Sequence, residues 1–90
     1  MIKVLYTKDF VKMLKHLPKD VQDLYLKNEE ILKTDWRDSR LHVKKLKGQV
    51  NVFSFRITRS YRALFYIRSD DEITLFAIGD RKDIYKKQLK

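Results

Sequence analysis

The sequence contains no cysteine, one proline and two glycines among its 90 residues. The absence of cysteine excludes a disulfide framework and a thiolate metal site, and it is compatible with a reducing compartment. The longest apolar run, residues 63–67, is far shorter than the roughly 20 residues that span a bilayer. The first residues also lack the long apolar stretch and cleavage site of a signal peptide. These absences predict a cytoplasmic protein with no membrane partner.

The chain is long enough for one compact core and no more. A chain of this length buries about 60–65% of the surface that its unfolded form exposes. Hydrophobic residues make up 43% of the sequence and aromatic residues 12%, which is too much for a disordered chain. We therefore expect residues 1–90 to form a single folded domain.

Positive charge is concentrated in the second part of the chain. Lysine and arginine total 21 against 12 acidic residues, which gives a formal net charge of +9. Residues 1–36 carry only +1 of this charge, whereas residues 37–90 carry +8 and hold every arginine. A charge excess favours solubility in any small domain. Such segregation, however, is typical of a surface that meets phosphates or an acidic protein.

The first part of the chain predicts a strand and a helical hairpin. Residues 2–6 alternate in polarity and indicate a short strand. Thr7 can cap a helix whose apolar residues recur at helical spacing as far as Leu17. Pro18 ends that helix and suits the start of a second one. The apolar side of the second helix carries Val21, Leu24, Tyr25, Ile31 and Leu32.

The remainder predicts a sheet. Residues 34–49 are polar and basic, and strand patterns then cover 52–57, 61–68 and 73–78. Residues 83–90 indicate a short terminal helix or tail. The order β-α-α-β-β-β predicts an α+β fold in which the helical hairpin packs on one face of an antiparallel sheet.

The alternation of the strands predicts which residues share a face. Odd positions from 53 to 57 and from 61 to 67 are apolar and should face the helices. A three-residue loop between them preserves this match and places Arg56 opposite Arg62 on the other, open face. Facing like charges repel, so the pair favours an anion such as phosphate between the two guanidiniums. The alternative is that one or both arginines turn aside to a carboxylate such as Asp80.

A second cluster follows the last strand. Arg81 comes directly after it and Tyr85 lies one helical turn later, so the two side chains should be neighbours. A tyrosine there can stack on a base or donate to a phosphate, or it can cap the edge of the core. His16 and His42 lie far apart without acidic residues at ligand spacing, so no metal site is expected.

Short motifs occur in the segments 46–48, 53–57, 61–66 and 79–85. The most specific are Tyr-Arg at 61–62 and the pattern Gly-x-Arg-x-x-x-Tyr that ends the last segment. In this order and spacing they resemble the RelE/ParE superfamily of toxins from bacterial and archaeal toxin–antitoxin systems. The resemblance covers nearly the whole chain. It implies a RelE-like fold, no cofactor, and a cognate antitoxin whose acidic or amphipathic segment wraps the basic toxin.

RelE-like members cleave messenger RNA in the ribosomal A site, and the resemblance implies that activity here. The substrate's 2′-hydroxyl would attack the adjacent phosphorus, in a site that works by positioning and charge stabilisation. By position, Arg62 and Arg81 would hold the scissile phosphate, Arg56 would support them and Tyr85 would stack on the message. The residues expected to contact RNA or the ribosome are Lys44, Lys45, Lys47, Arg59 and Lys82.

Ser54 departs from the RelE pattern. RelE itself carries a lysine there that is thought to act as a base, and a serine takes a proton poorly without an activating partner. This difference keeps two alternatives open: a ParE-like inhibitor of DNA gyrase without nuclease activity, or a catalytically decayed toxin. A general RNA-binding α+β domain is a further alternative. It is disfavoured because Tyr66 is the only aromatic residue on the even face of its strand.

Overall fold

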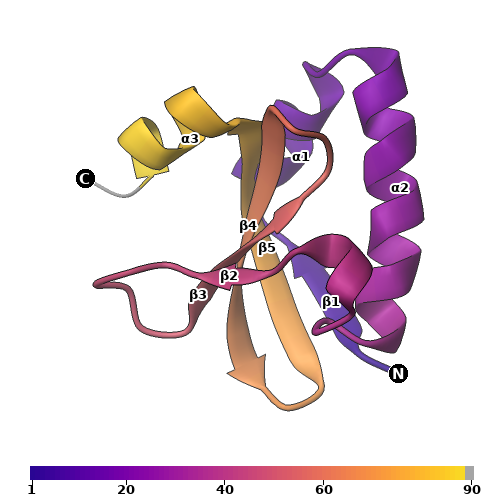
Figure 1. Cartoon of the computed structure of the whole chain (residues 1–90), viewed down its shortest axis with the longest axis vertical. Helices are drawn as coiled ribbons and strands as arrows, with labels where there is room; N and C mark the ends of the chain where they lie inside the picture. The colour runs from indigo at the N-terminus through magenta and orange to yellow at the C-terminus, as the bar shows by residue number, and fades with distance from the viewer. Residues whose placement is uncertain (89–90) are drawn as a thin grey trace.

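The computed structural model describes residues 1–88, and the side chains of residues 1–85. Figure 1 shows a twisted sheet with helices on both sides. The helices and strands, in chain order, are β1 (Lys3–Tyr6), α1 (Lys8–Lys15), α2 (Lys19–Thr34), the 3₁₀ turn η1 (Ser39–Leu41), β2 (Lys44–Lys45), β3 (Val52–Arg56), β4 (Tyr61–Ser69), β5 (Glu72–Asp80) and α3 (Arg81–Gln88).

The predicted α+β fold is confirmed, with two differences in the sheet. Its strand order is β1-β5-β4-β3-β2, so it has five strands, and β1 runs parallel to β5 while the other neighbours are antiparallel. The sequence pattern missed β2 and η1. Each is too short, at two and three residues, to show a periodic pattern.

The caps confirm the predicted starts of the first two helices. The Thr7 side chain accepts a hydrogen bond of 3.1 Å from the Phe10 amide, as expected for an N-cap. Pro18 occupies the N-cap position of α2. The terminal helix begins at Arg81, two residues earlier than predicted; of the predicted segment 83–90, residues 89 and 90 lie outside the described part of the chain.

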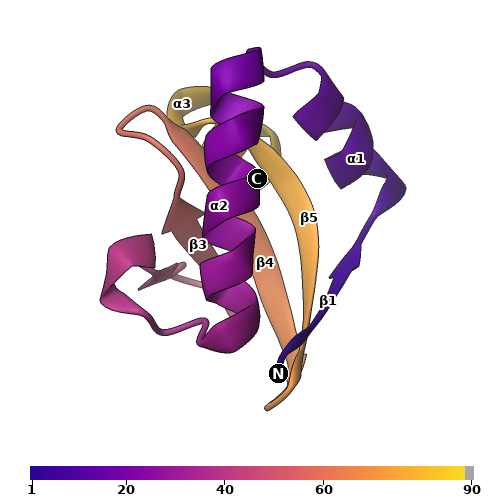
Figure 2. The same cartoon turned by 90° about the vertical axis from the view of Figure 1, so that its right-hand side faces the viewer.

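The main core lies between the α1–α2 hairpin and one face of the sheet, which we call the α2 face. Figure 2 shows α2 lying across this face. As predicted, the odd positions of β3 and β4 point into this core. Fully buried members are Phe10, Leu32, Leu41, Phe55, Ala63, Phe65 and Leu75. One predicted core residue is wrong: Leu24 is 39% exposed, because it lies on the solvent side of α2.

The opposite face is not fully open, which corrects the prediction. The pairing of β4 with β5 shifts between Leu64 and Phe65, and this bulge leaves Phe76 as an extra residue in β5. A second apolar cluster forms there from Leu64, Ala77 and Ile84, so α3 covers part of this face. Figure 1 shows α3 and α2 on opposite sides of the sheet.

A buried carboxylate joins α2 to the N-terminal strand. Glu29 is 8% exposed, and its Oε1 accepts hydrogen bonds of 2.6 Å from the hydroxyls of both Tyr6 and Tyr25. Its Oε2 lies 3.4 Å from the Lys33 ammonium. Burial, and next the hydrogen bond to Glu29, raise the pKa of both tyrosines well above 10.0. The cluster therefore keeps both tyrosines neutral.

Within residues 1–88, no helix is both long and apolar enough to cross a bilayer.

Candidate active site

Two arginines face each other on the side of the sheet opposite α2, which we call the arginine face. Arg56 of β3 pairs directly with Arg62 of β4, which confirms the predicted register. The hairpin closes through the Ile57 amide, which donates to the Tyr61 carbonyl at 3.0 Å. Arg56 is exposed and Arg62 is partly buried. The three-residue loop therefore brings two arginines to directly opposite positions on one face of the sheet.

Neither arginine turns aside to Asp80, so that alternative is wrong. The Asp80 carboxylate instead accepts the Lys82 amide at 2.9 Å and caps the start of α3. The Arg62 Nη1 donates to the carbonyl oxygen of Thr58 at 2.7 Å. Among the described residues, no carboxylate lies within ion-pair distance of Arg56 or Arg62. One edge of the Arg62 guanidinium is thus fixed, while its remaining donors are available to an anion.

The hairpin turn also positions Arg81. The Arg81 amide donates to the Ser60 carbonyl at 2.8 Å, which ties the start of α3 to the turn between β3 and β4. From the other side of the sheet, the Asn28 side chain donates to the Arg56 carbonyl at 2.9 Å. The Arg81 side chain is exposed. The three arginines therefore lie at one end of the sheet, around a β3–β4 hairpin end that is anchored to α2 and α3.

Tyr85 lies one turn after Arg81 on α3, as predicted. It packs against the second apolar cluster, and its hydroxyl lies 3.4 Å from the Ser54 Oγ, to which it donates. The ring covers the edge of this cluster, as the core-edge alternative expects, and the side chain stays partly exposed. Ser54 is only 2% exposed. It is placed to orient Tyr85 and is too deep to reach a substrate.

Gly79 leaves open space beside the arginines. It pairs with Arg62 across the β4–β5 ladder, so a side chain at this position would project from the arginine face. A Cβ atom built there would meet no heavy atom within 4 Å. The surface next to Arg62 can therefore admit a ligand.

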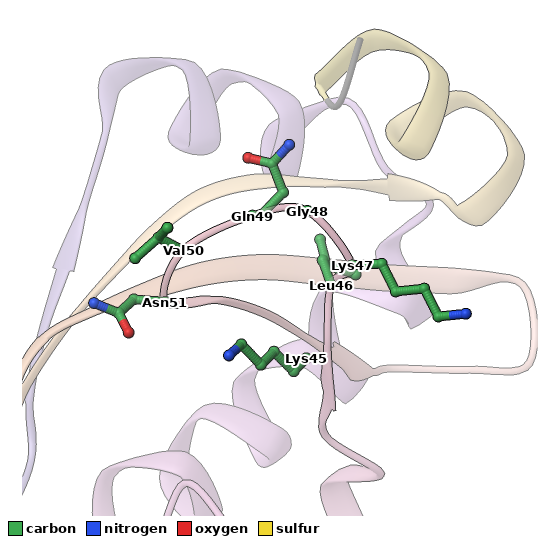
Figure 3. Close-up of a pocket in the computed structure, with 7 residues that line it drawn as sticks. All are labelled: Lys45, Leu46, Lys47, Gly48, Gln49, Val50 and Asn51. Atoms are coloured by element: carbon green, nitrogen blue, oxygen red, sulfur yellow. The ribbon is translucent and has the colours of Figure 1, made fainter.

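The predicted RNA-contacting residues do not share one surface. Lys44 pairs with Ser54 and belongs to the arginine face, whereas Lys45 pairs with Phe53 and belongs to the α2 face. Lys47 lies in the loop between β2 and β3, which surrounds a hollow of about 540 Å³. Figure 3 shows the side chains of Lys45, in β2, and Lys47, in this loop, extending in opposite directions. We call Arg56, Arg62 and Arg81 the arginine cluster. The other two predicted residues are exposed near it: Arg59 lies on the hairpin turn and Lys82 in the first turn of α3.

One feature of the arginine face was missed from the sequence. The Phe76 ring lies against Tyr66, with 5.7 Å between the ring centroids. Tyr66 pairs with Thr74, so alternation along β5 puts Phe76 on the same face as Tyr66, and the sequence alone does not reveal this register. Tyr66 is the only aromatic residue on the even face of β4, as the sequence predicts, but Phe76 of the neighbouring strand gives it an aromatic partner on this face.

The histidines do not join the site. His42 follows η1 in a left-handed conformation and lines a hollow with Phe53 of the α2 face, while His16 caps the end of α1. Within residues 1–88, no three metal-binding side chains gather as a ligand set. The site geometry consists of cations and one tyrosine, an arrangement suited to holding a phosphodiester.

A curated relative identifies the family. The chain is 35% identical over 86 residues to Toxin RelE3 of Methanocaldococcus jannaschii, a match that covers 93% of this chain and 96% of that protein. The chain belongs to the RelE toxin family. No model of a protein family matches the sequence.

Solved structures agree with the RelE assignment. The toxin-like fold is shared with the RelB–RelE antitoxin–toxin complex from Methanococcus jannaschii, at a TM-score of 0.77 and 29% identity over 92% of this chain and 96% of that chain. The archaeal RelE–RelB complex from Pyrococcus horikoshii gives 0.73 and 25%, over 89% and 94% of the two chains. The YoeB/ParE toxin from Agrobacterium tumefaciens, at 0.75 and 14% identity over 89% and 99%, shows the fold alone.

Proposed function

We propose that this RelE-family protein is the toxin of a type II toxin–antitoxin system and that it cleaves messenger RNA on the ribosome. The observation that carries the proposal is the cluster of Arg56, Arg62 and Arg81 at one end of the arginine face. Their side chains have no carboxylate partner among the described residues. Folding alone does not favour such a cluster, because like charges repel across a strand pair. An RNA phosphate would compensate it.

In the proposed reaction the 2′-oxygen forms a bond to phosphorus while the bond to the 5′-oxygen breaks. A proton leaves the 2′-hydroxyl and another is taken up by the 5′-oxygen, giving a 2′,3′-cyclic phosphate and a 5′-hydroxyl. Arg62 and Arg81 stabilise the charge that develops on the phosphate oxygens, and Arg56 supports them. Tyr85 stacks on a base and holds the message in place. No cofactor takes part.

The proposed partners are the ribosome, messenger RNA and a cognate antitoxin. The antitoxin is supported by the relatives, because two of the most similar solved chains were crystallised with RelB. A segment of acidic chemistry would match the +8 carried by residues 37–90. Such a segment would compete with RNA for the arginine cluster and so suppress cleavage.

Primer extension on a defined message in a reconstituted translation reaction tests the function. We expect cuts at A-site codons that require ribosomes and disappear with Arg62→Ala. A message that stays intact with the folded wild-type protein would overturn the nuclease. The Arg62→Ala protein should fold, because the substitution removes a single side-chain hydrogen bond to the hairpin turn.

Inhibition of DNA gyrase is the second candidate, and one observation favours it. Ser54, at the position where RelE carries its lysine, is buried under Tyr85 and offers no proton acceptor to a substrate. A protein that only binds gyrase needs no such group. A DNA supercoiling assay separates the two functions, since a gyrase inhibitor would block supercoiling and leave the message intact.

The open space at Gly79 gives a graded test of where the message lies. We expect Gly79→Leu to slow cleavage about 10²-fold, because its side chain would displace the phosphate from Arg62. Gly79→Ala should retain most of the activity. Both variants should match the wild type in thermal midpoint, since a Cβ atom at this position enters open space. Full cleavage by Gly79→Leu, measured by primer extension, would show that the message takes another path.

A further inference from the structure

A basic hollow separate from the arginine cluster lies where the segment after α2 passes β3. It has a volume of about 340 Å³, at the small end of the range that ligand sites occupy. Its floor is aromatic, because the Trp36 ring lies 5.1 Å from Phe53 and 6.1 Å from Phe65 between centroids. Phe53 and Phe65 belong to the main core, so the hollow opens on the side of the α2 face.

A guanidinium group is layered on this aromatic floor. The Arg37 Cζ lies 4.7 Å from the centroid of the Trp36 ring, within the range of a cation–π contact. Trp36 is only partly exposed and is fixed by Phe53, whereas Arg37 is exposed. The Arg37 guanidinium therefore lies over the Trp36 ring at the solvent-exposed rim of the hollow.

The charge around the hollow favours an anion. Of the described residues that line it, only Asp38 is acidic, and Arg40 binds both of its carboxylate oxygens, at 2.9 and 2.8 Å. Arg37 and Lys45 also line the hollow and make no ion pair with a described carboxylate. The hollow thus combines a neutralised acid with two available cations.

We propose that this hollow binds one unpaired RNA nucleotide, whose base stacks on the Arg37 guanidinium and whose phosphate is held by Lys45. The proposal rests on the proposed function, because it takes RNA as the ligand. A flat cation layered on an aromatic ring matches the face of a base. A carboxylate of an acidic protein would need the cations but not the ring. Since the hollow and the arginine face lie on opposite sides of the sheet, the nucleotide is separate from the scissile one.

The chain carries its own probe for this site. Trp36 is the only tryptophan in the sequence, so its fluorescence reports on the hollow alone. We expect a short unstructured RNA oligonucleotide to quench this fluorescence to saturation at fixed ionic strength. Arg37→Gln should weaken the apparent binding about tenfold, as expected when one stacking contact is lost. Arg37→Lys should weaken it nearly as much, because lysine keeps the charge and loses the plane.

Lys19→Gln is the matched control for lost charge. Its side chain is 81% exposed at the start of α2, and the 16-residue helix separates it from Trp36 by about 24 Å at 1.5 Å per residue. This variant should bind like the wild type. Arg81→Ala should also keep the quenching, because Arg81 lies in the arginine cluster and not in the hollow. A wild-type protein that shows the quenching but does not cleave the message would overturn the nuclease and not the hollow.

Three results would overturn the proposal. One is the absence of quenching by the oligonucleotide, and another is wild-type affinity in Arg37→Lys, which would show that only charge matters. The third is equal quenching by poly-glutamate, which would assign the hollow to an acidic protein. Filter binding to ribosomes without a message identifies the source of the nucleotide. Arg37→Gln weakens that binding if the nucleotide is ribosomal and leaves it unchanged if it belongs to the message.

Discussion

Replacing Arg81 by alanine should reduce cleavage about 10²- to 10³-fold, the loss expected when a group that stabilises transition-state charge is removed. The fold should be unaffected. The bond that Arg81 makes to Ser60 uses its backbone amide, which alanine retains, and its side chain is exposed. Removing a positive charge from the first turn of α3 is slightly favourable for the helix. The measurements are the rate of primer-extension cuts and the thermal midpoint.

Arg68→Ala is the matched control for Arg81→Ala. Arg68 is also an exposed arginine of the sheet, but it lies toward the other end of β4, where its Nε is 3.4 Å from Glu72. We expect wild-type cleavage from this variant. A lowered thermal midpoint in Arg81→Ala would show that Arg81 is structural, and unchanged cleavage would remove it from the site.

Replacing Glu29 by alanine should destabilise the protein by about 2–3 kcal/mol, which is the cost of a buried hydroxyl without its charged partner. The Tyr25 hydroxyl is the one left without a hydrogen-bond partner, since Tyr25 is 1% exposed. Tyr6 is 44% exposed, so its hydroxyl can bind water instead. In a domain of this size the thermal midpoint should fall by roughly 10–20 °C. Glu29→Gln keeps an acceptor oxygen and should lose less. Glu30→Ala, the exposed neighbour, is the control.

Alkaline titration gives an independent readout of the same cluster. Folding raises the pKa of Tyr6 and Tyr25. The stability that these two neutral tyrosines contribute is therefore complete below pH 10.0 and is lost as the pH rises further. Two of the five tyrosines should therefore resist ionisation above that pH until the chain unfolds. If ultraviolet absorbance shows every tyrosine ionised before the wild type unfolds, Glu29 does not protect Tyr6 and Tyr25 as proposed. A Glu29→Ala protein as stable as the wild type would show that Tyr25 finds another partner.

Several parts of the site could be predicted because they depend on local geometry. Side chains of a strand alternate between its two faces. A loop between β3 and β4 that was one residue shorter would therefore have exposed the apolar side chains of one strand to water. That requirement alone placed Arg56 opposite Arg62. Likewise, the spacing of Arg81 and Tyr85 fixed them one turn apart once the segment was helical.

Other parts depend on contacts between distant segments. From the sequence, the Asp80 carboxylate could equally have paired with an arginine. In the structure it accepts the Lys82 amide instead, because α3 starts beside it. The split of Lys44 and Lys45 between the two faces follows from their pairing with β3, which two residues of sequence do not reveal. The Trp36 hollow needs the segment after α2 to meet β3.

The sequence by itself determined the α+β class, the helical hairpin and the pairing of the two arginines, because periodicity and loop length act over a few residues. Only the tertiary structure decided that β1 lies parallel to β5, that a bulge at Phe76 changes the face of β5, and that α3 closes over Leu64 and Ser54. These features arise where elements far apart in the chain compete to bury the same apolar surface. A local sequence pattern does not determine which element buries that surface.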